Sequence, residues 1–210
     1  MRVRTVLVSL AALVLSVPIA LVAPSAAFAG GHPVDPTTLN PPLVHGNPVC
    51  AREGNRIYCH STVPQQHDLG TVDSGLRCGS TELLQTLVWT LERGESTYDA
   101  AGNVLTVTYI DSYTGSISDP DTGRSVAWTQ KDRFAVVLTT PGDDTAGTAT
   151  MLELQKVYGP TGRVILTDAG TEVLSLPDGA RLKATGHHPI DDALYDGTMT
   201  GLAPLCHALA

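Results

Sequence analysis

The densest group of side chains that could do chemistry comes late in the sequence: His187, His188, Asp191, Asp192 and His207. Imidazole and carboxylate groups in this combination could bind a metal ion or act as an acid–base pair. However, adjacent side chains on an extended segment point to opposite faces, which would keep His187 and His188 from sharing one ion. We therefore expect no metal site here and interpret the group as a surface loop that Pro189 closes.

Two tripeptides match the active-site strings of aspartic proteases, Asp121-Thr122-Gly123 and Asp73-Ser74-Gly75. Those enzymes use two carboxylates that share a proton, and each tripeptide follows an apolar strand. Here Asp119-Pro120 precedes the first tripeptide and a polar segment precedes the second. Since Asp and Gly are common turn residues, we interpret both as turns. A calcium loop beginning at Asp119 is also disfavoured, because its twelfth position is Gln130 rather than Glu.

No nucleophile, metalloprotease or phosphate-loop motif occurs in the sequence. We therefore assign no catalytic residue and expect no cofactor. Trp89 and Trp128 could line a ligand cavity, although aromatic residues within strands more often pack in the core.

The four cysteines are Cys50, Cys59, Cys78 and Cys206, and their spacing does not match the paired Cys-x-x-Cys pattern of zinc sites. An even number of cysteines in an exported chain predicts disulfides, and four cysteines allow three pairings. We favour Cys50–Cys59, across a hairpin that turns at Glu53-Gly54-Asn55, together with Cys78–Cys206.

The first residues have the pattern of a secretory signal peptide. Arg2 and Arg4 precede an apolar run, and Ala27-Phe28-Ala29 places small residues at the positions that signal peptidase recognises. We expect cleavage before Gly30 and a secreted product with no membrane anchor. The alternative is an uncleaved anchor, since the apolar run is just long enough to span a bilayer.

The remaining chain would be acidic. Loss of Arg2 and Arg4 would leave 11 basic residues against 21 acidic ones. A surface of this charge repels phosphate backbones, so nucleic acid is not an expected partner.

The elements that must position these residues are strands. From Thr81 to Arg93, Leu83, Gln85, Leu87, Trp89 and Leu91 fall on one face and a mixed set falls on the other. This period of two predicts a strand with one buried face. Further strands are expected at 104–113, 125–130, 133–140, 148–158, 164–167, 171–176 and 180–185, with short helical turns at 190–195 and 201–209.

About eight short strands separated by turns predict an all-β fold, as a single antiparallel up-and-down β-barrel or, alternatively, a β-sandwich. The expected organisation is a signal peptide (1–29), a Pro-rich flexible arm (30–49), a cystine hairpin and connector (50–77) and a β-barrel domain (78–210). The arm contains five prolines and has no hydrophobic period.

The signal peptide, the Cys78-Gly79-Ser80 start, the run of strands, Thr122-Gly123 and the late Cys206 together resemble uncharacterised secreted β-barrel proteins of high-GC Gram-positive bacteria. The architecture is similar to lipocalin-like and allene-oxide-cyclase-like barrels. The resemblance implies a barrel over residues 78–206 and carries over no catalytic residue.

Two functions from different classes follow as expectations. The first is a secreted, non-catalytic module that binds a small apolar ligand or a protein partner. The second is a small secreted enzyme, a hydrolase or isomerase, that uses His187 or His188. The absence of a nucleophile motif favours the first.

Overall fold

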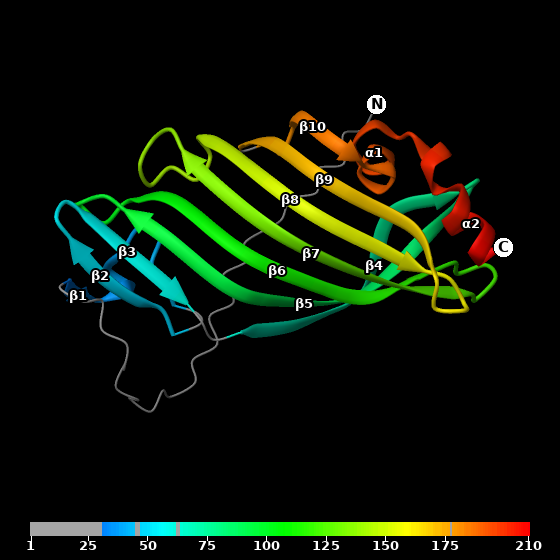
Figure 1. The fold of residues 1–210 in the computed structure, drawn as a ribbon, viewed down its shortest axis with the longest axis horizontal. Helices are drawn as coiled ribbons and strands as arrows, with labels where there is room; N and C mark the ends of the chain where they lie inside the picture. The colour runs from blue at the N-terminus through cyan, green and yellow to red at the C-terminus, as the bar shows by residue number, and fades with distance from the viewer. Residues whose placement is uncertain (1–30, 45–46, 62–63, 177) are drawn as a thin grey trace.

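The computed structural model describes residues 31–44, 47–61, 64–176 and 178–210. These residues form one antiparallel sheet of ten strands with short helices after it, which confirms the all-β prediction (Figure 1). The expected signal segment, residues 1–29, lies outside the described residues.

Six long strands make the body of the sheet: β4 (Gln65–Cys78), β5 (Thr81–Tyr98), β6 (Val104–Ser118), β7 (Ser125–Leu138), β8 (Gly147–Tyr158) and β9 (Val164–Leu176). The shorter strands are β1 (His32–Val34), β2 (Val49–Glu53), β3 (Arg56–Ser61) and β10 (Arg181–His187). The helices are α1 (Pro189–Asp196) and α2 (Ala203–Leu209), with the 3₁₀ turns η1 (Pro36–Thr38) and η2 (Met199–Leu202).

Several elements differ from the sequence-based expectation. β7 and β9 are each one continuous strand where two were predicted, because Asp132, Asp168 and Gly170 lie inside strands instead of breaking them. β4 was predicted to be a polar connector. It is an exposed strand whose register shifts twice, so it lacks a clean alternation of apolar residues.

The N-terminal segment expected to be a flexible arm also contains regular structure. β1 pairs with β2, and the side chain of Asp35 accepts a hydrogen bond from the backbone N–H of Thr37 in η1. The cystine hairpin β2–β3 continues the main sheet through the pairing of β3 with β5.

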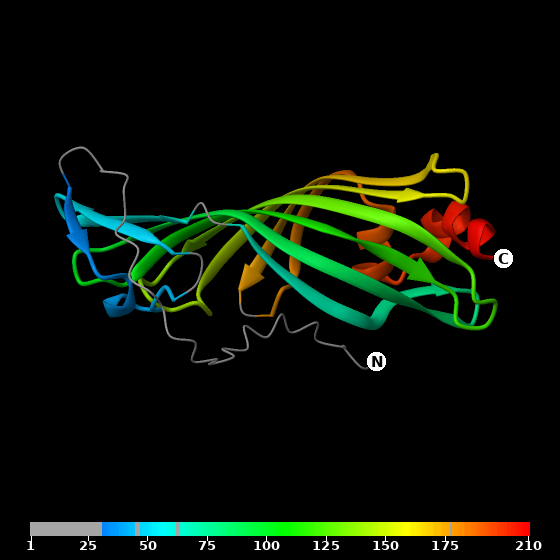
Figure 2. The same ribbon diagram turned by 90° about the horizontal axis from the view of Figure 1, so that it is seen from below.

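The strands from β5 to β10 follow chain order, each antiparallel to the next. The other side of β5 has two partners: β3 pairs with residues 94–98, and β4 pairs with residues 81–91. β3 and β4 therefore lie end to end along β5, as Figure 2 shows from below.

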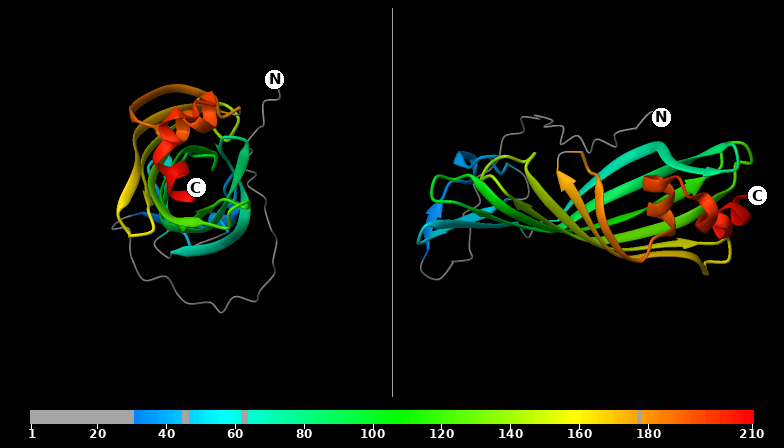
Figure 3. Two further views of the ribbon diagram at one scale, coloured as in Figure 1. Left: turned by 90° about the vertical axis from the view of Figure 1, so that its right-hand side faces the viewer. Right: turned by 90° about the horizontal axis from the view of Figure 1, so that it is seen from above.

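The sheet curls but stays open, unlike the closed barrel predicted from the strand pattern. Within the described residues no ladder joins β4 to β10. α1 lies across the open side, since it contacts both β4 and β9, whereas α2 contacts β9 and β7. Viewed from the end, the sheet curls around α2 (Figure 3).

The main core lies between the concave face of the sheet and these helices. Leu83 of β5 and Trp128 of β7 pack there with Leu202 and Leu205 of the helical segment. The face of β5 predicted to be buried is this concave face, because Leu83 and Leu87 belong to the core and Trp89 is half-buried. A smaller core surrounds Ile57 and Tyr98 beside the cystine hairpin.

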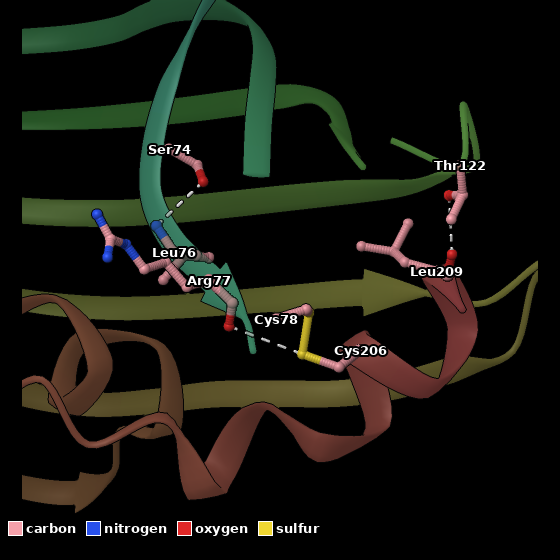
Figure 4. The surroundings of a disulfide bond; sticks show 7 residues. All are labelled: Ser74, Leu76, Arg77, Cys78, Thr122, Cys206 and Leu209. Atoms are coloured by element: carbon pink, nitrogen blue, oxygen red, sulfur yellow. Dashed lines mark hydrogen bonds between the residues drawn. A yellow bond between two sulfur atoms is a disulfide. The ribbon is translucent and has the colours of Figure 1, made fainter. Parts of the chain in front are cut away.

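Both predicted disulfides are present. Cys50–Cys59 links β2 to β3, and Cys78–Cys206 links the end of β4 to α2. The hydroxyl of Thr122, in the turn between β6 and β7, donates a hydrogen bond of 3.0 Å to the carbonyl of Leu209 (Figure 4). The sheet thus holds α2 at two points.

Within the described part of the chain, neither α1 nor α2 has the length and apolar character that crossing a bilayer would require.

Candidate functional site

A line of acidic side chains crosses the concave face of the sheet. Asp111 of β6 is paired with Asp132 of β7, and Asp132 is paired with Glu153 of β8. All three residues are buried. Residues paired directly across strands share a face, so the three carboxyl groups form one row. Gly170 of β9, which pairs with Glu153, is the next residue in this row.

Gly170 makes room for His188. A Cβ atom at position 170 would lie 2.3 Å from Nε2 of His188 and 2.2 Å from the carbonyl oxygen of Thr185. Asp168 and Glu172, two residues away on either side, share the face of Gly170 and are completely buried. The imidazole therefore takes the space that a side chain at 170 would fill, between two acidic neighbours.

The two nitrogens of His188 have different surroundings. Nε2 lies 3.1 Å from the carbonyl oxygen of Thr185, so this nitrogen is protonated and donates a hydrogen bond to that oxygen. Nδ1 lies 3.0 Å from Oδ1 of Asp168 and 3.1 Å from Oε1 of Glu153. Oδ2 of Asp191 and Oε1 of Glu172 follow at 3.7 and 3.8 Å. Nδ1 thus faces four carboxyl groups.

Asp168 also holds the start of α1 against the sheet. Its Oδ2 accepts hydrogen bonds from the backbone N–H groups of Ile190, at 2.7 Å, and Asp191, at 3.1 Å. A carboxylate at this position satisfies the free donors of the first helical turn and complements the helix dipole. One side chain therefore fixes α1, His188 and Asp191 relative to β9.

Arg181 of β10 supplies the positive charge nearest to the cluster. Its guanidinium lies 2.6 Å from Glu172 and 2.7 Å from Asp192. It also lies 5.5 Å from the centre of the Tyr195 ring, within the range of a cation–π contact. Glu172 therefore has a positively charged partner in Arg181.

Burial raises the pKa of the five acidic groups on the strands of this region: Asp111, Asp132, Glu153, Asp168 and Glu172. The pKa of Asp111 rises to about 6, and those of Asp132 and Glu172 rise to about 7. Burial, and then the neighbouring Asp191 carboxyl, raise the pKa of Glu153 much further, and burial also raises the pKa of Asp168. Carboxyl groups this close together and this poorly hydrated retain protons near neutral pH.

A cavity of about 200 Å³ lies beside this cluster, between the concave face and α1. Its apolar walls come from Leu76, Ile117, Trp128, Met151, Ile190 and Leu194, and its polar walls come from Ser74, Gln85, Gln130, Glu153, Gln155 and Asp191. Apolar and polar residues therefore line the cavity in about equal measure.

The polar group predicted to be a surface loop is partly buried instead: the structure brings together the buried His188 and Asp191, while Asp192 pairs with Arg181. His187 and His207 are exposed. As predicted, Asp119–Gly123 is a turn, in which Oδ1 of Asp119 accepts a hydrogen bond of 2.7 Å from the N–H of Asp121. The same prediction for Asp73-Ser74-Gly75 is wrong, because these residues lie within β4, where its register shifts. Of the two tryptophans, Trp128 both packs in the core and lines the cavity.

Sequence reasoning missed the larger part of the site: Asp111, Asp132, Glu153, Asp168 and Glu172. These residues lie on four different strands, and only their pairing register brings them together. One local signal was available, namely an acidic residue at an inward position in the middle of a long alternating strand.

Comparison of the chain with protein-family models, curated proteins and solved structures finds no match.

Proposed function

We propose that this chain is a secreted, non-catalytic β-sheet module that binds a small apolar ligand between its curled sheet and its C-terminal helices. The cavity of about 200 Å³ carries the proposal. The open sheet and α1 together border this space, in a place comparable to the lumen that lipocalin-like barrels form with strands alone. Two disulfides and an acidic composition fit an exported protein.

The lining indicates what kind of ligand would fit. The volume is below the roughly 300–1,000 Å³ of pockets for drug-sized ligands, so the ligand is as small as a single ring or a short chain. Trp128, Ile117 and Leu76 would contact its apolar body. The amides of Gln85 and Gln155 both donate and accept hydrogen bonds, and therefore suit an uncharged polar end such as a hydroxyl group.

The second candidate is a small secreted enzyme that uses His187 or His188, and the buried contact of His188 with Asp168 favours it. Binding is preferred for a geometric reason. His188 does not line the cavity, and its two ring nitrogens already face Thr185 and the carboxyl groups. A general base must instead reach the proton it abstracts.

A fluorescence titration tests the binding proposal. In a Trp89→Phe background the emission of Trp128 reports on the cavity alone, because Trp128 lines it. We expect a saturable change with cyclohexanol and a weaker one with cyclohexanecarboxylate, whose charge the neighbouring acidic groups oppose. A response that rises linearly without saturating for both compounds would reject the proposal.

Two neighbouring substitutions on β8 supply the control. Gln155→Met removes a polar group of the wall and should weaken cyclohexanol binding by about 0.5–1.5 kcal/mol, roughly two- to tenfold in Kd. Lys156→Met changes the next residue, on the opposite face, and should leave Kd unchanged. Equal effects of the two substitutions would place the ligand elsewhere.

A further inference from the structure

Four buried side chains beside the cavity point their donor atoms at one another. Nδ1 of His188 and one carboxyl oxygen each from Glu153, Asp168 and Asp191 all lie within 4.8 Å of one another. Four donors placed about 2.0–2.2 Å from a common ion are separated by roughly 3–4.4 Å, so this spacing already approaches that of a coordination shell.

The side chain of Asp191 provides an independent indication that this cluster binds a ligand. It is only 4% exposed, yet its Oδ2 has no hydrogen-bond partner within the described part of the chain. A buried carboxyl oxygen without a donor costs free energy that the fold must recover elsewhere. Oδ2 lies 3.7 Å from Nδ1 of His188, which places it at the centre of the cluster.

We propose that Glu153, Asp168, His188 and Asp191 bind one divalent transition-metal ion, such as Zn²⁺ or Mn²⁺, at the polar side of the cavity. One imidazole nitrogen and three carboxylate oxygens form a ligand set that suits these ions. The absence of a thiolate disfavours soft ions such as Cu⁺, because both cysteine pairs are in disulfides. The proposal goes beyond the ligand cavity and does not depend on it.

The groups behind the four ligands are arranged as a metal site requires. Nε2 of His188 donates to the carbonyl of Thr185, which leaves the lone pair of Nδ1 directed at the ion. The N–H groups of Ile190 and Asp191 hold Oδ2 of Asp168, so that its Oδ1 faces inward. Arg181 neutralises the neighbouring Glu172, which limits the excess negative charge around the ion.

The site also has an entry path. Glu153 and Asp191 line the cavity as well as the cluster, so an ion or a water molecule can reach the four ligands from the cavity side. A position left open towards the cavity would remain for water or for a polar group of a bound molecule.

Metal titration of the full exported chain, freed of metal with EDTA, tests the proposal. We expect one Zn²⁺ per chain by calorimetry, and a Co²⁺ absorption spectrum typical of mixed nitrogen and oxygen ligation. Asp191→Asn should weaken binding at least about tenfold, since it removes a ligand carboxylate. Asp192→Asn, the adjacent residue that pairs with Arg181, should leave the affinity within about twofold.

The variants also separate loss of metal from loss of fold. Asp191→Asn keeps the side-chain shape, and Oδ2 makes no hydrogen bond that the substitution could break. Unfolding in EDTA should therefore be unaltered or slightly improved, and Glu153→Gln provides a second, independent loss of affinity. No stoichiometric binding by the unchanged chain would overturn the proposal. So would binding that survives both substitutions, because the metal would then lie on exposed histidines such as His187 or His207.

Discussion

At the scale of single residues, the unusual feature is an acidic row where a β-sheet core is normally apolar. Asp111, Asp132 and Glu153 are buried in register across three strands. A buried carboxyl group that keeps its proton avoids the large cost of a buried charge, but it makes the stability of the fold depend on pH.

Asp111 gives the simplest test of this dependence. An unfolded Asp ionises near pH 4, whereas burial raises the pKa of Asp111 to about 6. Between these values the folded state binds more protons, so stability falls as pH rises from about 4 to about 6 and then levels off. The Asp111→Asn side chain does not ionise, so this variant does not lose stability over that pH range. In EDTA it should be more stable than the unchanged chain by about 1–3 kcal/mol at about pH 7.5, with a much smaller difference at about pH 4.

Urea unfolding across that pH range measures the effect. A stabilisation that stays constant with pH would show that packing, rather than ionisation, separates the two side chains.

Gly170 is the second single residue on which the site depends. A Cβ atom there would lie within 2.3 Å of both Thr185 and His188. Gly170→Ala should therefore cost about 1–3 kcal/mol or more, as overpacking does in tight cores. The matched change Gly94→Ala, on β5, meets no atom within 4 Å and should cost much less. Thermal unfolding of the two variants compares them directly, and equal losses would contradict the close approach of His188.

At the scale of elements, β-strand alternation predicted the fold well where strands are apolar and poorly where they carry the site. On β5, Leu83 is buried and Leu87 packs against the core as predicted, whereas residues 84 to 92 are half-buried on both faces. β7 and β9 were divided in two, because Asp132, Asp168 and Gly170 look like strand breaks. These same residues build the carboxyl cluster and the space for His188. A linear sequence contains no pairing register, so the row across β6, β7 and β8 could not be predicted.

The two tryptophans of the concave face differ in burial, because one lies in the core and the other near the edge of the sheet. Trp128, on β7, is 4% exposed, whereas Trp89, near the β4 edge, is half-buried and stacks on His67 with ring centres 5.2 Å apart. Trp128→Ala should cost about 3–5 kcal/mol, as for a large core residue. Trp89→Ala should cost clearly less, because less of its surface leaves water. Urea unfolding of both variants with the disulfides intact measures the difference, and a larger cost at Trp89 would move the centre of the core towards β4.

At the scale of the whole molecule, an open sheet and a helical segment complete one another. α1 lies across the open side between β4 and β9, α2 packs against β9 and β7, and Cys78–Cys206 joins sheet and helix across 128 residues of chain. The cysteine pairing was predicted from the sequence, and so were helical turns at both places. Their role in closing the sheet could not be predicted, because a barrel and an open curled sheet share the same alternation.

The two disulfides should differ in their effect on stability. In the chain-entropy model, closing a long loop such as that of Cys78–Cys206 is worth about 4–5 kcal/mol. Cys50–Cys59 spans only 9 residues and should contribute under about 3 kcal/mol. Pairwise Cys→Ala variants, compared by thermal unfolding, measure both. If loss of Cys50–Cys59 lowered the free energy of unfolding more than loss of Cys78–Cys206, the hairpin would contribute more to stability than the link between sheet and α2.

The sequential order of the strands from β5 to β10 also has a kinetic consequence. Each of these strands pairs with its immediate neighbour in the chain, so this part of the sheet is a series of long hairpins. All-β folds with pairing of this range assemble in roughly milliseconds to seconds. Oxidation of Cys78 with Cys206 takes seconds to hours and must wait until α2 has docked. The curled sheet should therefore form before its open side is covalently closed, and the rate of thiol oxidation would set the time of that closure.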